Sequence, residues 1–417
     1  MVFCSNEEQI NMARTVALLP VGTRLSDYLS LGLLARAVPL KAVNAALART
    51  KKGSRRERDL PAYVVVYYVM ALALYMQSSY REVLRCLLEG LRWLQGPSAV
   101  RKIAGKSGIS QARQRLGWEP VQRLHDKLVA PVAMAKTRGA WYRQWRLVSL
   151  DGSTMEVADT VENASAFGRP TNQKGAGGYP QLRFVSLVEN GTHVLFGSRL
   201  GGYKTAEVSL ARDVTSQLRP GMLCLADRLF LSYKLWNHAQ GTGADLLWRV
   251  SKTFILPCEQ RLPDGSYLSR MYRNTKDRQK QCGGLTVRVI DYRLQGIAGA
   301  EPLYRVVTTI LEPERAPAAE LAALYHERWE LETALDELKT HLRGAKIVLR
   351  SKTPDLVRQE FYGLLLTHFA IRKLMHEAAL QAKEDADHLS FLHTVRIARR
   401  KFPHYGAIPP SGEKSPA

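Results

Sequence analysis

Short apolar strands, turns and helices alternate between Trp145 and Val250, and this alternation constrains the fold more than any other feature. Gln181–Glu189 and Thr192–Leu200 each alternate apolar and polar residues, and they flank Asn190-Gly191, a dipeptide typical of hairpin turns. Three further apolar runs predict buried strands, and two segments predict helices: Trp145–Leu150, Met222–Ala226 and Asp245–Val250, then Ala206–Leu218 and Ser232–His238. A sheet combined with helices in this way belongs to the α/β class.

Helices are expected before this region. Residues 1–140 predict an all-helical N-terminal domain. Its apolar run Leu60–Met76 predicts a buried helix, because it is shorter than the roughly 20 residues that cross a bilayer. Ser78–Glu82 supplies an N-cap and an acidic first turn for the next helix. Polar residues interrupt any apolar stretch at the N-terminus, so no signal peptide is expected.

Residues 251–312 replace the α/β pattern with short strands and turns, which predicts a β-rich insertion. Helices are expected after it, at about residues 316–342 and over Asp355–Ala382. We therefore expect a central domain over residues 141–382, and a basic helix with a flexible tail over residues 383–417. Asn163–Pro180 is rich in glycine, asparagine and lysine and predicts a mobile loop.

The net charge of +22 indicates a polyanionic partner. Nucleic acid is the commonest such partner, and a membrane surface is the competing interpretation. Residues 101–146 contain eleven Lys or Arg and two Asp or Glu. Gly108–Gly117 within them could form a recognition helix capped by Ser110, although a solvated basic helix fits as well. Four side chains of that helix would face a groove or phosphates: Gln111, Arg113, Gln114 and Arg115.

The cysteines are scattered without paired spacing: Cys4, Cys86, Cys224, Cys258 and Cys282. This distribution argues against a zinc site and against a disulfide framework. It fits a reducing cytoplasm.

Tyr325–Lys339 contains no glycine or proline and is rich in strong helix formers, so it predicts a helix. On a helix of 3.6 residues per turn, Tyr325, Arg328, Glu332 and Lys339 fall within an arc of about 60°. That arc lies beside an apolar stripe, where a carboxylate can be held rigidly and still reach a ligand. An amphipathic helix with ordinary ion pairs is the competing interpretation.

The other positions of this helix divide into a buried and an exposed set. We expect Glu330 and Glu337 to face water. The stripe that packs against the sheet consists of Leu324, Leu331, Leu335, Leu338 and Leu342.

Two aspartates each follow an apolar strand, Asp151 after Val148–Leu150 and Asp227 after Leu223–Ala226. Open α/β sheets place their sites at such strand ends. A third carboxylate, Glu332, would require cations to offset the mutual repulsion, and oxygen ligands select Mg²⁺ or Mn²⁺. Two such ions can activate a water or a 3′-hydroxyl toward a phosphodiester. Either aspartate alone is more often a cap or turn residue.

The spacing Tyr325-x₂-Arg328-x₃-Glu332-x₆-Lys339 resembles the Tyr-Arg-Glu-Lys signature of bacterial insertion-sequence transposases, the DDE type of the IS-four group. Asp151-Gly-Ser resembles the first acidic motif of that family, and Leu225-Ala-Asp227-Arg-x-Phe230 resembles the second. One departure is Leu229, where many relatives have glycine. Other segments that resemble the family are Leu60–Leu94, Phe167–Pro170 and Tyr179–Arg183.

The resemblance implies an RNase H-like catalytic core, interrupted by the β-rich insertion and preceded by a helical DNA-binding domain. It implies that Asp151, Asp227 and Glu332 form a catalytic triad that holds two Mg²⁺ ions, with Mn²⁺ as a substitute. Further side chains are expected to contact DNA: Tyr325, Arg328 and Lys339 at the end phosphates, and Arg228, Arg113, Arg115, Arg343 and Arg350 elsewhere.

The implied activity is that of a transposase. Such an enzyme binds the terminal inverted repeats of its element, cleaves at the ends and joins the 3′-hydroxyls to target DNA. We expect a homodimer in the synaptic complex, acting on the nucleoid in the bacterial cytoplasm and not on a membrane. A metal-dependent nuclease of the same fold and an inactive DNA-binding relic are the alternatives, and the presence of all three acidic residues disfavours the relic.

Members of this family can form hairpin ends, which requires a nucleotide to leave the base stack. An aromatic side chain in or near the insertion would hold that base. Trp248 and Tyr272 are candidates by location, although Trp248 also fits the core of its apolar strand.

Overall fold

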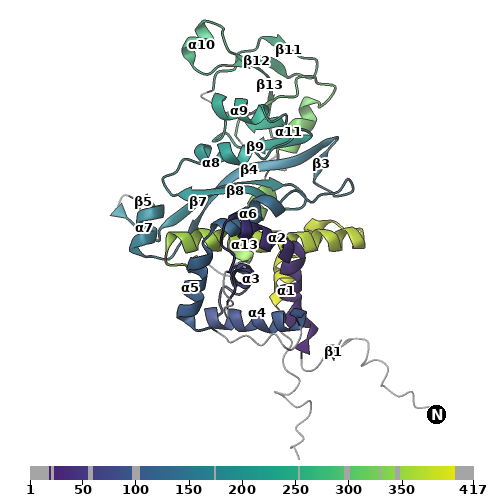
Figure 1. The fold of residues 1–417 in the computed structure, drawn as a ribbon. Coiled ribbons are helices and arrows are strands. Elements are labelled where there is room, and N and C mark those ends of the chain that lie inside the picture. Colours follow the sequence, from purple (N-terminus) through teal and green to yellow (C-terminus); the bar gives the residue numbers. More distant parts are fainter. Residues whose placement is uncertain are drawn as a thin grey trace, which may run out of the picture.

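One large sheet and a set of helices make up the protein (Figure 1). The structure is a computed structural model that describes residues 18–19, 23–54, 60–95, 104–172, 175–251, 254–294, 301–326, 328, 330–342 and 348–399. Its mixed content of strands and helices confirms the predicted α/β class.

Ten strands of the described residues form the large sheet, in the order β11-β12-β13-β14-β10-β9-β4-β7-β8, with β3 paired to β4. The pairs β4–β9 and β9–β10 are parallel, and the other pairs are antiparallel. The strands are β3 (Trp141–Tyr142), β4 (Trp145–Glu156), β7 (Gln181–Glu189), β8 (Val194–Gly202), β9 (Met222–Ala226), β10 (Asp245–Arg249), β11 (Gln260–Arg261), β12 (Tyr267–Met271), β13 (Leu285–Tyr292) and β14 (Tyr304–Thr308).

The predicted strands are present, with changes in their bounds. β4 continues past Leu150 to Glu156, because its second half pairs with β7 as far as Gln181. The turn between β7 and β8 extends to His193, where the backbone takes a positive φ of 55°, so β8 starts two residues later than predicted. Two short strand pairs are also present among the described residues: β1 (Leu18–Leu19) with β2 (Thr23–Arg24), and β5 (Thr171–Asn172) with β6 (Gly175–Ala176).

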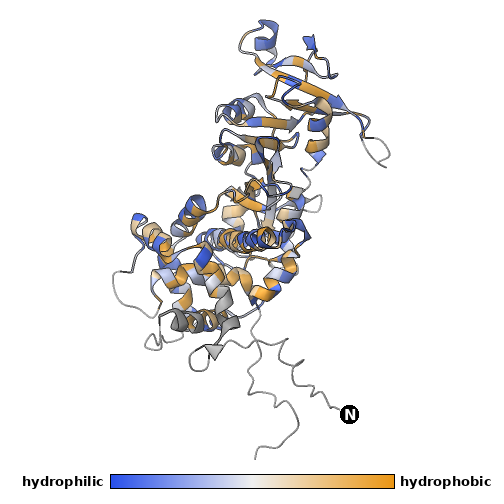
Figure 2. Cartoon of the chain, turned by 90° about the vertical axis from the view of Figure 1, so that its right-hand side faces the viewer, coloured by the Kyte–Doolittle hydropathy of each residue, from blue (hydrophilic) through white to orange (hydrophobic). Residues whose placement is uncertain are grey.

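The insertion extends the same sheet. β14 pairs with β10, and β13 and β12 follow outward, so the predicted β-rich character is confirmed. A five-residue helix, α10 (Thr275–Gln279), lies at its tip, which is hydrophilic in Figure 2.

The helices before β3 are α1 (Leu25–Ala37), α2 (Leu40–Arg49), α3 (Ala62–Leu74), α4 (Tyr80–Gln95), α5 (Lys106–Leu116) and α6 (Glu119–Leu128). Those that follow are α7 (Val161–Phe167), α8 (Glu207–Thr215), α9 (Tyr233–Gln240), α11 (Ala318–His326), α12 (Glu330–Asp336), the π-helix η2 (Glu337–His341), α13 (Pro354–Ala382), the 3₁₀ helix η3 (Ala386–His388) and α14 (Phe391–Arg399).

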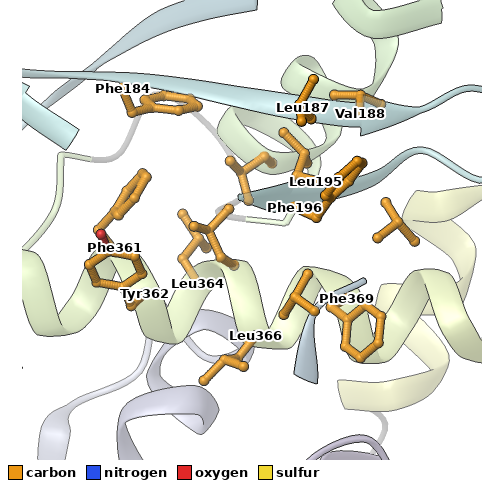
Figure 3. Close-up of a cluster of buried hydrophobic side chains, with 14 of the residues drawn as sticks. Phe184, Leu187, Val188, Leu195, Phe196, Phe361, Tyr362, Leu364, Leu366 and Phe369 are labelled. Atoms are coloured by element: carbon orange, nitrogen blue, oxygen red, sulfur yellow. The ribbon is translucent and has the colours of Figure 1, made fainter. Parts of the chain in front are cut away.

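Helix α13 joins the sheet to the N-terminal helices. One face packs its aromatic and leucine side chains onto β7 and β8 (Figure 3), and the rings of Phe184 and Phe361 lie 5.2 Å apart. On the opposite face, the Thr367 hydroxyl donates to the carbonyl of Met70 in α3 at 2.9 Å. α13 is therefore buried on both sides, as its continuous apolar pattern requires.

The apolar helix α3 is buried, as predicted: every residue from Val64 to Leu74 is nearly inaccessible to solvent. Across the described ranges, no single helix is long and apolar enough to cross a membrane. One bent pair of helices, Leu31–Ala37 with Leu40–Arg49, passes that test by length and composition.

Three local predictions were wrong. The segment Asn163–Pro180 is not a loop throughout, because Val161–Phe167 forms α7, capped by the Thr160 hydroxyl. Ser110 does not cap α5, which begins at Lys106 and carries Ser110 inside it. The helix expected over residues 316–342 is divided into α11, α12 and η2.

Candidate active site

The sheet places Asp151 and Asp227 on neighbouring strands. β4 runs parallel to β9, and Leu150 pairs with Ala226, so the next residue on each strand is an aspartate. Asp227 ends β9, whereas Asp151 lies in the middle of β4, at the point where its parallel pairing with β9 stops. The two carboxylates therefore meet at one edge of the parallel part of the sheet.

Asp151 is a largely desolvated carboxylate. Burial raises its pKa to about 6, although the Gly152 amide and the Arg328 guanidinium act in the opposite direction. The negative charges of Glu207 and Asp227 add to the increase in pKa. The Gly152 N–H donates to Asp151 Oδ1 at 2.8 Å, and Arg328 Nη1 lies 3.7 Å from Oδ2. A cation would relieve this repulsion.

Asp227 carries an orphaned oxygen. Its Oδ1 is inaccessible to water and has no hydrogen-bond partner within the described part of the chain. A buried acceptor without a partner costs free energy, unless a ligand that the site is built for satisfies it. Together with the desolvated Asp151, this hard oxygen donor fits a divalent cation such as Mg²⁺.

Two residues of the Tyr-Arg-Glu-Lys spacing hold the helical segment onto these strands. The Tyr325 hydroxyl donates to the carbonyl of Ala226 at 3.2 Å, and burial raises the pKa of that phenol. The Arg328 guanidinium carbon lies 6.0 Å from the centre of the Tyr325 ring, and the guanidinium also faces Asp151. Both side chains therefore lie beside the aspartates, and the tyrosine is 6% exposed.

Lys339 reaches the same strand, and Glu332 does not. Lys339 Nζ donates to Ser153 Oγ at 2.9 Å, two residues beyond Asp151 on β4. The Glu332 side chain on α12 is exposed. Within the described ranges, no three histidine, cysteine, aspartate or glutamate side chains lie close enough together to hold a metal ion. The structure therefore brings the two aspartates together without the third carboxylate.

The separate bounds of α11 and α12 explain part of this result. A helix of 3.6 residues per turn places Tyr325 and Glu332 on one face only if it is continuous, and α11 ends at His326. The leucine stripe itself is buried as predicted: Leu324, Leu331, Leu335, Leu338 and Leu342.

The expectation that Glu337 faces water was wrong. Its side chain is 3% exposed and pairs with Arg372 of α13. A π turn begins at this residue, because the Leu342 N–H donates to the carbonyl of Glu337, five residues back, at 2.8 Å. A count of 100° per residue no longer holds there. The side chain of Glu330 lies outside the described residues.

Sequence reasoning missed Glu207, which lies beside the aspartates. A Cβ added to Gly152 would come within 2.7 Å of the Glu207 carboxyl carbon, so glycine leaves room for this side chain. Arg183 Nε lies 3.6 Å from the same carboxylate. The glycine of Asp151-Gly-Ser is the one sequence signal of this close approach, and nothing in the sequence names its partner.

In the absence of divalent metal, Asp151→Asn is expected to stabilise the protein by about 1–3 kcal/mol at about pH 8. The folded-state pKa of about 6 exceeds the roughly 3.9 of an unfolded aspartate, so ionisation of the folded form costs stability. Asparagine removes this cost. The gain should be absent near pH 4, grow up to about pH 6 and then stay constant. Thermal unfolding in EDTA measures it, and an unchanged or lower stability at pH 8 contradicts it.

Arg113, expected to contact DNA, is instead a buried link. It is 3% exposed, its Nε donates to Gln359 Oε1 at 2.8 Å, and one Nη donates to Ser351 Oγ at 2.9 Å. Arg115, two residues later, is exposed. Of these two arginines on helix α5, only Arg115 is accessible to a ligand, because Arg113 is buried against α13.

Arg350, also expected to contact DNA, makes contacts within the protein. Its Nη1 donates to the carbonyl of Ser78 at 2.6 Å, and its guanidinium carbon lies 4.8 Å from the centre of the Tyr80 ring. The Arg228 side chain is 44% exposed and lies 3.3 Å from Glu301. Arg343 lies outside the described residues.

The two aromatic candidates differ in exposure. Trp248 is fully buried and packs edge-to-face on Trp236 with ring centres 5.3 Å apart, so it belongs to the core. Tyr272 on the insertion is half-buried. The four cysteines of the described part of the chain form no disulfide with one another: Cys86, Cys224, Cys258 and Cys282.

Two known sequence families match the part of the chain that carries this site and the part before it. A family described as the insertion element 4 transposase N-terminal region matches residues 28–126. A second family, the transposase DDE domain, matches residues 144–370, more than half of the chain. The chain belongs to the insertion element 4 family of DDE transposases. Asp151, Asp227 and Glu332 all lie within the matched DDE domain, and transposase domains of this type use divalent metal ions.

Two relatives from Escherichia coli (strain K12) are similar to this transposase. The transposase InsG of insertion sequence element IS4 is 29% identical over 369 residues, 87% of this chain and 78% of the relative. The putative transposase InsZ is 25% identical over 224 residues, 52% of this chain and 70% of that protein. A piggyBac transposase synaptic complex with hairpin DNA has 10% identity and a TM-score of 0.47, covering 89% of this chain and 79% of that one.

Proposed function

We propose that this transposase binds the terminal inverted repeats of its insertion element, cleaves the DNA at both ends and joins the 3′-hydroxyl ends to target DNA. The observation that carries the proposal is the pair of neighbouring aspartates, in which burial raises the pKa of Asp151 and the buried Oδ1 of Asp227 lacks a partner among the described residues. Such a pair fits the cation that phosphodiester chemistry requires. The net charge of +22 supports DNA as the partner.

Asp151, Asp227 and Glu332 would hold two Mg²⁺ ions, for which Mn²⁺ would substitute. When bound, these ions supply the Lewis acidity that activates a water or a 3′-hydroxyl and stabilises the leaving oxygen. Three carboxylates repel one another without cations, so we propose that metal and DNA together draw Glu332 toward the aspartates. Its exposed position on α12 leaves it free to move.

Arg328 and Lys339 would hold the phosphates next to the scissile bond. Arg328 already lies beside Asp151, and Lys339 is fixed by Ser153 on the same strand. A guanidinium gives paired hydrogen bonds to a phosphate, and an ammonium gives a point charge, so the two would orient the strand for attack. Tyr325 would act mainly by fixing Arg328, because its own hydroxyl is bonded to Ala226.

The strand order β8-β7-β4-β9-β10 supports an RNase H-like core over residues 141–382, with residues 251–312 inserted before α11. We assign end recognition to residues 1–140, where Arg115 is exposed, and a basic tail to residues 383–417. Two protomers would bring two transposon ends together on the bacterial nucleoid. The products of cleavage of labelled, uncut end duplexes would show whether the ends pass through hairpins.

A strand-transfer assay tests this function. The substrate is a pre-cut duplex with the inverted repeats that flank the gene, mixed with supercoiled target DNA and Mg²⁺. We expect target molecules that carry one or two joined ends. Nicking without joining would contradict transposition and favour a metal-dependent nuclease of the same fold. End binding without either reaction would indicate an inactive DNA-binding protein.

A further inference from the structure

Four ionisable side chains meet in the protein interior beside the segment that carries Glu332 and Lys339. Glu337, Arg372, His193 and His368 are each at most 4% exposed as side chains. They come from η2, from α13 and from the turn between β7 and β8. None of them belongs to the Tyr-Arg-Glu-Lys spacing or touches the aspartates.

Directional bonds connect the four groups. Arg372 Nε donates to Glu337 Oε2 at 2.7 Å, and its Nη2 donates to the other carboxylate oxygen. His193 Nδ1 lies 3.2 Å from Glu337 Oε1, and His368 Nε2 lies 3.4 Å from Oε2. The second ring nitrogen of His193 is 3.5 Å from Asp387 at the edge of the cluster. Both carboxylate oxygens of Glu337 therefore accept hydrogen bonds from Arg372.

Leucine contacts alone would bury this helical segment at a lower cost in free energy than a buried ion pair does. Leu335, Leu338 and Leu342 already pack against the core. Removing a carboxylate and a guanidinium from water costs free energy that their attraction often only balances. Burial acts against the charged form of Glu337, but hydrogen bonds from the two histidines and the charge of Arg372 outweigh it and lower its pKa. What the pair adds over leucine is a fixed orientation, because two parallel charged hydrogen bonds are directional.

The cluster lies between the two functional side chains of the segment. Glu332 precedes Glu337 by five residues, and Lys339 follows it by two. The π turn starts at Glu337, and π turns occur frequently at functional sites. The bond from Lys339 to Ser153 is a single contact between polar groups. The buried pair thus holds this segment through two charged hydrogen bonds, whereas Lys339 holds it through one.

We propose that Glu337 is a positioning residue, whose paired bonds to Arg372 fix the rotation of the α12–η2 segment and so hold Glu332 at the rotation from which metal and DNA draw it to the two aspartates. The inference rests on the proposed function of Glu332. A loss of this bond would leave the leucine stripe buried and would let the segment turn, because apolar contacts have no preferred direction. Metal binding would weaken first, since a carboxylate that is displaced by about 1 Å no longer meets the cation.

The double variant Glu337→Leu with Arg372→Met tests this role. It replaces the pair by apolar side chains of similar volume, so folding should survive, as replacements of buried ion pairs often do. The first readout, taken on the protein bound to its end DNA, is the Mn²⁺ concentration that gives half of the metal-dependent increase in melting temperature. We expect that concentration to rise at least about fivefold, because the bound metal stabilises only the folded state. Joining of pre-cut ends should slow about tenfold or more at an unchanged Kd for end DNA.

The matched control is Arg113→Met with Gln359→Leu, which removes another buried hydrogen bond made by α13 but on its N-terminal side. It should change the melting temperature and leave the Mn²⁺ midpoint unchanged. A wild-type Mn²⁺ midpoint and joining rate in the Glu337–Arg372 double variant would overturn the proposal. Absence of joining by the wild-type protein would reject the proposed function instead, and the Mn²⁺ midpoint would still decide the inference.

If the double variant fails to fold, the Mn²⁺ midpoint of Glu337→Gln is compared with that of the wild type instead. Glutamine keeps one oxygen acceptor for Arg372, so the segment should be held more loosely but not released. We expect a smaller increase in the Mn²⁺ midpoint at an unchanged Kd for end DNA. An unchanged midpoint in this variant would overturn the proposal.

Discussion

Glu332→Gln is expected to lower the rate of end cleavage by at least about 10³-fold while end binding stays within about twofold of wild type. Glutamine keeps the size of glutamate but loses the negative charge that a divalent cation requires. Binding should persist, because Glu332 is one exposed side chain in a protein with a net charge of +22. Cleavage of labelled end duplexes under single-turnover conditions measures the first quantity, and a gel-shift titration measures the second.

Asp336→Asn is the matched control for this prediction. It removes a carboxylate from the same helix, and its side chain is 54% exposed and lies 3.5 Å from His341. We expect wild-type cleavage from the control. Normal cutting by Glu332→Gln would reject the assignment of the third carboxylate, whatever the control does.

Arg113→Met is expected to lower the free energy of unfolding by about 2–4 kcal/mol. The substitution removes the donors that satisfy Gln359 and Ser351 and leaves those buried groups without partners. The neighbouring change Arg115→Met should alter the stability by less than about 0.5 kcal/mol, because its side chain is exposed. Urea unfolding at low salt compares the two variants.

In end binding we expect the opposite ranking, with the larger effect from Arg115→Met and the smaller from Arg113→Met. Arg115→Met is expected to weaken the affinity for end DNA and to reduce its salt dependence by about one counterion. Arg113→Met, measured well below its melting temperature, should bind ends nearly as wild type does. A large loss of affinity without a loss of stability in Arg113→Met would restore this arginine as a DNA contact.

Local pattern was enough to predict the parts of the site that depend on strand placement. Apolar runs identified β9 and the first half of β4, and the residue after each run was the aspartate that the structure brings to the shared edge. The hairpin of β7 and β8 was found from its alternation and its Asn-Gly turn. These features depend on neighbouring residues, so the sequence carries them directly.

Long-range contacts account for what local pattern missed. Glu337 is buried because Arg372 and His193, 35 and 144 residues away in sequence, surround it. Arg113 is buried because Gln359, 246 residues later, accepts its hydrogen bond. An exposed and a buried polar residue look alike in a sequence, since burial is decided by a partner that the local pattern does not identify. The end of α11 at His326 likewise has no glycine or proline as a signal.

The direct test of the carboxylate centre is to map which parts of the chain lie next to the bound metal. Iron(II) is loaded in place of Mg²⁺ on the protein bound to its end DNA, and ascorbate with peroxide then cuts the backbone close to the ion. We expect fragments that end near Asp151, Asp227 and Glu332, and we expect excess Mg²⁺ to suppress all three. Cuts near the two aspartates but none near Glu332 would contradict a three-carboxylate centre in this transposase.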